Sequence, residues 1–220
     1  MSDEGSEIKA FARRLFQENK QFFDLLKARS SASGFELAIH RLMGGSPQEK
    51  KVVSIGATPI ICSEATKNAL SFVPLRWRDE FDKASGPWRG CENWRAGYPF
   101  IVWVEIRGRD DGTRGHLKLN AEVGPIANRK IRMGIIDAIA MEASARNLER
   151  IHFPTGSSDE KNLYSRFLRL NSIPVNDVQD VGEIESKIVQ LVNGFTPEFE
   201  MIARLIPLFC SSSNPLWASR

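Results

Sequence analysis

A period-two pattern between residues 100 and 123 constrains the fold of this chain more than any other feature. Apolar side chains alternate with polar or aromatic ones on both sides of an Asp-Asp-Gly turn signal at residues 110 to 112. The apolar set is Val102, Val104, Ile106, Leu117, Leu119, Ala121 and Val123. Such alternation is typical of strands with one buried face. We therefore predict a β-hairpin in which each strand has one buried and one polar face.

The segments that flank the hairpin carry helical signals. The predicted helices are residues 33 to 44, 63 to 70, 128 to 148, 157 to 170, 181 to 194 and a last helix that begins at Thr196-Pro197 and ends or kinks at Pro207. Short strands are expected at residues 51 to 55 and 59 to 62, and an irregular segment at 71 to 103. This order indicates an α+β fold: an antiparallel sheet built on the central hairpin, covered by C-terminal helices, with an N-terminal helical arm.

The domain boundaries follow from the same pattern. We expect a helical arm at residues 1 to 30, one α+β domain at 31 to 210 and a flexible tail at 211 to 220. The arm has an apolar stripe at helical spacing, formed by Ile8, Phe11, Leu15, Phe22 and Leu25. Two interpretations are open: the stripe packs on the domain itself, or it forms a homodimer and makes the chain a structural subunit.

Composition narrows the class of protein. The chain has 30 Lys and Arg against 27 Asp and Glu, a net charge of +3, which excludes the uniform basicity of a histone-like protein. Its three cysteines are far apart and indicate a reducing, cytoplasmic setting, and no apolar run is long enough to cross a membrane. Catalytic, metal-binding and cofactor-binding motifs are not recognisable, so we expect a non-catalytic binding module.

Charge and aromatic residues concentrate in the middle of the chain. Residues 76 to 132 hold twelve basic and eight acidic side chains, and four of the five tryptophans lie between residues 71 and 103. Guanidinium groups pair with phosphates and indoles stack on bases, so this composition points to nucleic acid or to a partner protein. The candidate binding residues are Arg76, Arg78, Trp88, Arg89, Trp94, Arg95, Arg107, Arg109, Arg114 and Lys118. The alternative is that the tryptophans form core and the arginines a solvated rim.

A metal-dependent nuclease is the second functional hypothesis. Such enzymes have an acidic residue before a strand and then a carboxylate and a lysine two residues apart, so that the two carboxylates hold a divalent ion. The candidate set is Glu105, Arg107 and Glu122 with an acid from residues 79 to 82, although arginine occupies the lysine position.

Several short segments also resemble a known family. They include Ser71-Phe72-Val73-Pro74, Trp94, Trp103-Val104-Glu105, Glu122-Val123-Gly124-Pro125, Arg132, Tyr164 to Leu168 and Phe195-Thr196-Pro197-Glu198. Their order over residues 71 to 205 resembles the accessory region that follows the catalytic core in bacterial nucleases of the PD-(D/E)xK superfamily. The resemblance implies recognition of nucleic acid or a partner in phage defence or counter-defence, with catalysis lost or supplied by another chain.

Overall fold

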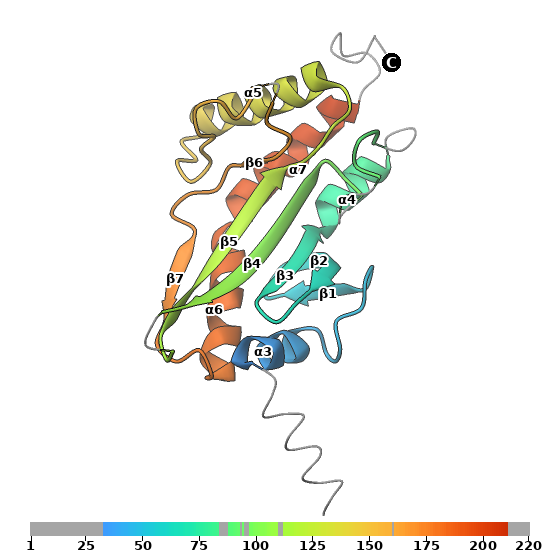
Figure 1. Cartoon of the computed structure of the whole chain (residues 1–220). Helices are drawn as coiled ribbons and strands as arrows, with labels where there is room; N and C mark the ends of the chain where they lie inside the picture. The colour runs from blue at the N-terminus through green and yellow to red at the C-terminus, as the bar shows by residue number, and fades with distance from the viewer. Residues whose placement is uncertain are drawn as a thin grey trace, which may run out of the picture. The chain divides into compact units, whose positions relative to one another are not determined.

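The computed structural model describes residues 33–83, 88–92, 94, 97–109, 112–159 and 161–210 (Figure 1). The predicted helical arm with its dimer stripe, the tail and Arg95 lie outside the described residues. The described residues from Gly34 onward belong to one compact unit. Within them, no helix is both long and apolar enough to cross a bilayer.

One antiparallel sheet forms the centre of this unit. Its strands are β1 (Val52–Ile55), β2 (Thr58–Ala65), β3 (Ala69–Pro74), β4 (Phe100–Gly108), β5 (Gly115–Val123), β6 (Ser165–Arg166) and β7 (Ser172–Val175). They pair in the order β1-β2-β3-β4-β5-β6, and β7 pairs with β5 beside β6. The predicted α+β class is confirmed, and β4 and β5 form the predicted central hairpin.

The hairpin register places two chemically different faces back to back. Leu119 lies opposite Val104 on one face, whereas Lys118 lies opposite Glu105 on the other. Beyond the strands, Gly112 has a φ of +71°, a left-handed conformation that glycine adopts without steric cost.

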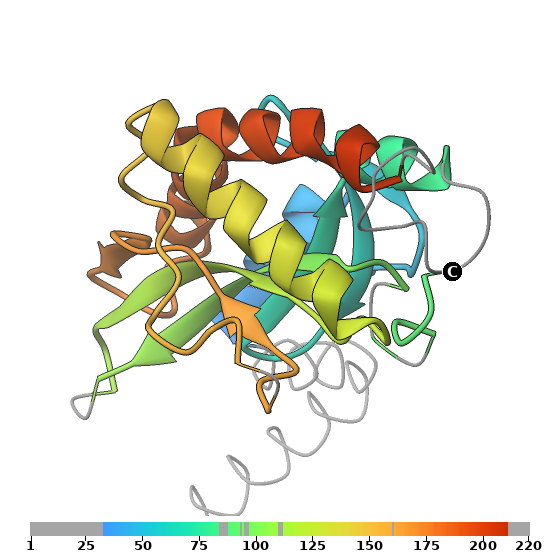
Figure 2. The same ribbon diagram turned by 90° about the horizontal axis from the view of Figure 1, so that it is seen from above.

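Helices cover one side of the sheet. They are α3 (Gly34–Leu42), α4 (Leu75–Asp82), α5 (Arg129–Ala145), α6 (Val181–Gly194) and α7 (Thr196–Cys210). Figure 2 shows α5 and α7 on the same side of β4 and β5. Both α5 and α6 begin at a side-chain cap, because the Asn128 side chain accepts from the amide of Ile131 and the Asp180 side chain from that of Glu183. α7 does not end at Pro207 but continues to Cys210.

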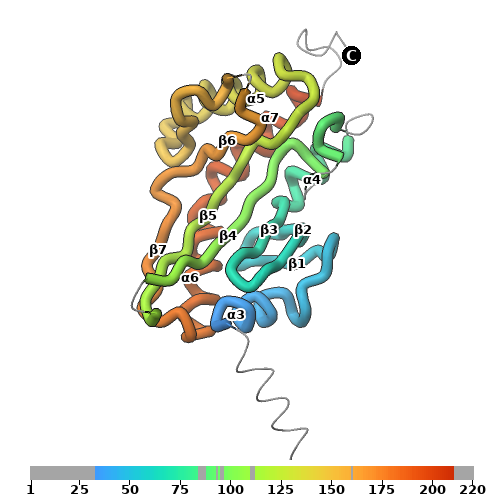
Figure 3. Tube along the Cα trace, in the orientation of Figure 1, coloured from blue at the N-terminus to red at the C-terminus, as the bar shows by residue number. Residues whose placement is uncertain are grey.

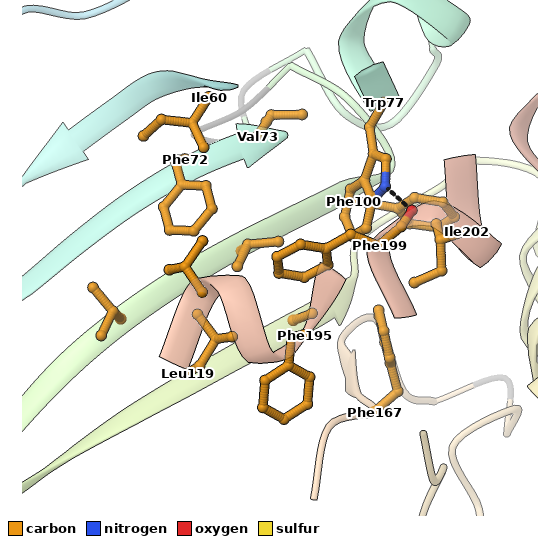
Figure 4. Packing of buried hydrophobic residues seen from close by; sticks show 14 of the residues in the cluster. Ile60, Phe72, Val73, Trp77, Phe100, Leu119, Phe167, Phe195, Phe199 and Ile202 are labelled. Atoms are coloured by element: carbon orange, nitrogen blue, oxygen red, sulfur yellow. Dashed lines mark hydrogen bonds between the residues drawn. The ribbon is translucent and has the colours of Figure 1, made fainter. Parts of the chain in front are cut away.

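The core lies between these helices and the apolar face of the hairpin (Figure 4). Trp77 of α4 is fully buried, and its indole Nε1 donates a hydrogen bond of 2.8 Å to the carbonyl of Phe199 on α7. Its ring meets that of Phe100 edge to face at 5.7 Å. Trp77 therefore ties α4 and α7 to the start of β4.

Three predicted segments differ from the structure. Residues 63–70 form no helix, because they belong to the β2–β3 hairpin, whose turn is stabilised by Thr66 Oγ1 accepting from the amides of Asn68 and Ala69. Residues 71–82 are regular rather than irregular, since they form the end of β3 and all of α4.

The third difference is the helix predicted from Ser157, which is absent from the described residues of 157–170. Buried Arg132 of α5 donates instead to the carbonyl of Ser157 (3.2 Å) and to the hydroxyl of Ser165 (2.7 Å). Desolvation lowers the pKa of this guanidinium, while Glu122 partly compensates by raising it. The segment is thus held as turns that lead into β6 (Figure 3).

A short polar network supports β7. The Glu183 carboxylate accepts from the amides of Asn176 (3.0 Å) and Asp177 (3.1 Å) and pairs with Lys187. The hydrogen bond from Lys187, and after it those from the two amides, lower the pKa of Glu183 to about 2. Lys187 also donates to the carbonyl of Pro174, in the middle of β7.

Candidate nucleic-acid interface

The polar face of the sheet collects the candidate binding residues that the structure brings together. We call it the outer face, and it lies opposite the side covered by α5, α6 and α7, toward the viewer in Figure 1. Its residues are Trp103, Glu105 and Arg107 of β4, His116, Lys118, Asn120 and Glu122 of β5, and Arg166 of β6. In the described part of the chain, no helix lies over these residues (Figures 1 and 2).

An indole and a guanidinium meet in the middle of the outer face. The Cζ atom of Arg166 lies 4.8 Å from the centroid of the half-buried Trp103 ring. Arg166 is kept in place from the other side by Glu122, with 3.5 Å between Nε and Oε2. The guanidinium therefore lies over the face of the indole as a cation–π pair.

A second aromatic pair lies where β5 ends. The rings of Trp94 and Tyr164 are 6.2 Å apart, and Tyr164 is 52% exposed. Trp94 packs directly on Gly124, where a Cβ atom would approach the indole to 2.2 Å. Only glycine allows this contact, so Gly124 fixes the position of Trp94. Because Tyr164 precedes Arg166 by two residues, both side chains belong to the same side of the sheet.

The segment around Trp94 is anchored at the start of α5. Ala127 donates its amide to the carbonyl of Arg89 (2.8 Å), and the Cys91 thiol donates to the carbonyl of Pro125 (3.2 Å). Burial raises the pKa of this thiol to about 12, with a further contribution from Glu92, so Cys91 stays protonated and packs as an apolar group. Arg89 is exposed beside the loop that leads into α5.

Trp88 does not contribute an exposed indole, and that expectation is wrong. It is 6% exposed and meets the ring of Phe81 edge to face at 5.4 Å. Together with Trp77, it follows the alternative interpretation in which the tryptophans form core.

Two candidate arginines belong to α4 and not to the outer face. Arg76 pairs with Glu200 of α7. Arg78 pairs with two acids of its own helix, at 2.7 Å from Asp79 and 3.5 Å from Asp82. Both guanidinium groups therefore serve local ion pairs.

The hairpin supplies the remaining cations. Arg107 is exposed and donates to Glu105 at 3.0 Å, and Lys118 is directly opposite Glu105 on β5. Arg109 and Arg114 follow at the turn, where the amide of Arg109 donates to the carbonyl of Arg114 (2.7 Å). The predicted residues that share the outer face or its ends are thus Trp94, Arg107, Arg109, Arg114 and Lys118.

Sequence reasoning missed Trp103, Tyr164 and Arg166 as members of this surface. Trp103 was assigned to the hairpin but not to the binding set, and the other two fell in a predicted helix. In the structure, exposed Tyr164 and Arg166 alternate with buried Ser165 and Phe167. The residue types do not show this alternation, because an aromatic residue occupies an exposed position and a serine a buried one.

The nuclease hypothesis requires carboxylates that converge, and the register separates them. Glu105 is opposite Lys118 and Glu122 is opposite Ile101, four residues farther along the pair, or about 13 Å. Glu105 accepts from Arg107 and from Asn120 Nδ2 (3.2 Å), and Glu122 pairs with Arg166. Among the described residues, no group of three or more acidic, His or Cys side chains is arranged to hold a metal ion.

Comparison with protein-family models, with curated proteins and with solved structures found no match to this chain. The resemblance to the PD-(D/E)xK accessory region stays a prediction.

Proposed function

We propose that this protein binds single-stranded nucleic acid on the outer face of its sheet. The observation that carries the proposal is the pairing of Arg166 with Trp103 in the middle of that face, at 4.8 Å. Unpaired bases stack on aromatic rings and on arginine guanidinium planes, and the cation also attracts the phosphate. A duplex hides the faces of its bases, which favours a single strand as the ligand.

The aromatic and cationic groups also have a suitable order along the sheet. Trp94 and Tyr164 lie at the end where β5 finishes, and Arg107 lies toward the hairpin turn. The strand between Phe100 and Gly108 is about 27 Å long, which is enough for several nucleotides. Lys118 lies between these ends on β5. A nucleic-acid strand bound along this line would contact both the aromatic rings and the cations.

The carboxylates of the outer face limit how strong this binding can be. Glu105 and Glu122 each pair with an arginine of the same face, so the surface is not a dense positive patch. We therefore expect stacking to supply more of the affinity than charge, and the salt dependence to be moderate. If the same residues bind a partner protein instead, single-stranded and duplex DNA should bind equally weakly, with no preference for unpaired bases.

The test is fluorescence anisotropy with a labelled single-stranded DNA and with the same sequence as a duplex, over a series of salt concentrations. Trp103→Ala should weaken single-strand binding about 10-fold, because a stacking platform is lost. Arg166→Ala should also reduce the slope of log K against log salt by about 0.7, the value of one single-strand phosphate contact.

The matched control is Arg146→Ala, which removes an exposed arginine at the end of α5 that pairs with Glu142 (2.5 Å). Its affinity and salt slope should equal those of the wild type. The proposal would be contradicted if Arg146→Ala and Arg166→Ala lost the same affinity for single-stranded DNA. It would also be contradicted if the duplex bound as tightly as the single strand.

A further inference from the structure

A cleft of about 340 Å³ lies over β2 and β3, apart from the outer face residues described above. Its floor contains Ile61 and Val73, which are register partners on these strands. Val73 follows Phe72, an inner-face residue, and therefore belongs to the same side of the sheet as Trp103. The cleft is thus on the side of the sheet where we place the nucleic acid.

The shape of the cleft is fixed by a rigid aromatic wall. The Tyr98 ring stacks on Phe81 with 5.6 Å between centroids and 17° between planes. Its hydroxyl donates to Asp82 at 2.7 Å, and desolvation together with this hydrogen bond raises the pKa of Tyr98 to about 12. Since Phe81 covers one ring face, a ligand can use only the other face or the edge.

Polar groups of both signs line the rest of the cleft. Lys50 and Arg78 are donors, Glu49 is an acceptor, and the Ser63 hydroxyl can act as either. Arg78 is already neutralised by Asp79 and Asp82. This balance disfavours a multiply charged anion inside the cleft and suits a neutral ligand with donors and acceptors on its rim.

A β-bulge places Ser63 at the cleft. The register of β2 and β3 shifts between Cys62 and Glu64, so Ser63 is the extra residue of β2. Bulges of this kind redirect a side chain that would otherwise follow the pleat, and they are frequent beside binding sites.

We propose that this cleft holds one nucleobase of the bound strand. A base is planar, neutral and carries donors and acceptors around its edge, which matches a floor of Ile61 and Val73, a Tyr98 wall and a mixed polar rim. The volume of about 340 Å³ admits one base with its sugar. The identification of the ligand rests on the proposed function, whereas the location rests on the cleft alone.

The experiment measures binding of the free nucleosides adenosine, guanosine, cytidine and thymidine, with inorganic phosphate as the anion probe. Two-dimensional amide NMR of the full-length protein should show nucleoside-induced shifts at Ser63, Val73 and Tyr98. Ser63→Phe fills the cleft and should weaken nucleoside binding at least about 10-fold, because stacking contacts are lost. The matched control Ser144→Phe adds the same ring at an exposed position of α5, away from the cleft, and should bind like the wild type.

The outcomes separate this proposal from the proposed function. Trp103→Ala should weaken strand binding while nucleosides still shift the cleft amides. No nucleoside-induced shift in the wild type overturns the cleft proposal even where the DNA strand binds. Shifts confined to residues outside the cleft, or phosphate shifting the cleft amides as strongly as nucleosides do, also overturn it. The NMR shifts of the wild-type protein are enough to overturn the cleft proposal. The test therefore remains valid even if the Ser63→Phe variant does not fold.

Discussion

The two faces of the β4–β5 hairpin use the same backbone for opposite purposes. On the inner face, Val104 and Leu119 are register partners with no exposed surface. One residue away on each strand, Trp103 and Lys118 are only half-buried. The pleat alone separates them, so one strand pair stabilises the core through alternate residues and offers the others to a ligand.

The largest expected effect is on the inner face. Leu119→Ala should lower the free energy of unfolding by about 3 kcal/mol, because it removes a buried side chain and leaves a cavity between β5 and the helices. Urea denaturation followed by circular dichroism measures this change. A loss below about 1 kcal/mol would mean that the core refills the site and that the contrast between the faces is weaker than their burial suggests.

Asn120 tests a strand position where the contrast is blurred. It belongs to the outer face, yet it is 2% exposed and donates to Glu105 Oε1 at 3.2 Å. Asn120→Ala should cost about 1 kcal/mol, since it removes a hydrogen bond to a charged group. Glu105→Gln keeps an acceptor at this position and serves as the control in the same urea titration. A cost equal to that of Leu119→Ala would assign Asn120 to the core.

The Glu183 network at β7 lies outside both faces of the hairpin, and it makes the stability of the protein depend on pH. Glu183 has a pKa of about 2 in the folded state, below the value of about 4.3 in an unfolded chain. Its contribution is therefore complete above about pH 4.3 and is lost as the pH falls toward 2. Glu183→Gln should lower stability at pH 7 by about 1 kcal/mol and flatten the acid limb of a melting-temperature profile. An acid limb identical to that of the wild type would show that other carboxylates control it.

The smallest effect on stability is expected for the outer face. Lys118→Ala should change the free energy of unfolding by less than about 0.5 kcal/mol, since the side chain is half-buried on the face away from the core and its truncation leaves no cavity. The same variant should weaken single-strand DNA binding a few-fold, by loss of about one phosphate contact. Calorimetry and anisotropy on one sample measure both quantities. A large stability loss with unchanged affinity would reverse the assignment of the two faces.

The hairpin could be predicted because its signal is local. Alternation over nine residues on each strand specifies both the element and its buried face. Helices α5 and α6 could be predicted for the same reason, since Asn128 caps the start of α5 and apolar residues at helical spacing run from Val181 to Leu191 in α6.

The candidate site was harder to predict from the sequence, because its residues are brought together by long-range packing. Trp94 is positioned by Gly124 and Tyr164, and Arg166 reaches Trp103 across β5. Composition counted the arginines and tryptophans correctly but could not sort them by face. The structure shows that Trp77 and Trp88 are buried in the core, whereas Trp103 is not. It also shows that Arg76 and Arg78 form ion pairs.

The edge at β7 has a consequence for the behaviour of this protein at high concentration. Among the described strands, β7 pairs with β5 alone. Pro174 has no amide hydrogen to donate to an added strand, and its carbonyl already accepts a hydrogen bond from Lys187. A strand from a neighbouring molecule would find neither donor nor acceptor in the middle of that border. The molecule is thereby protected at this margin from the chain-to-chain stacking that leads to fibrils.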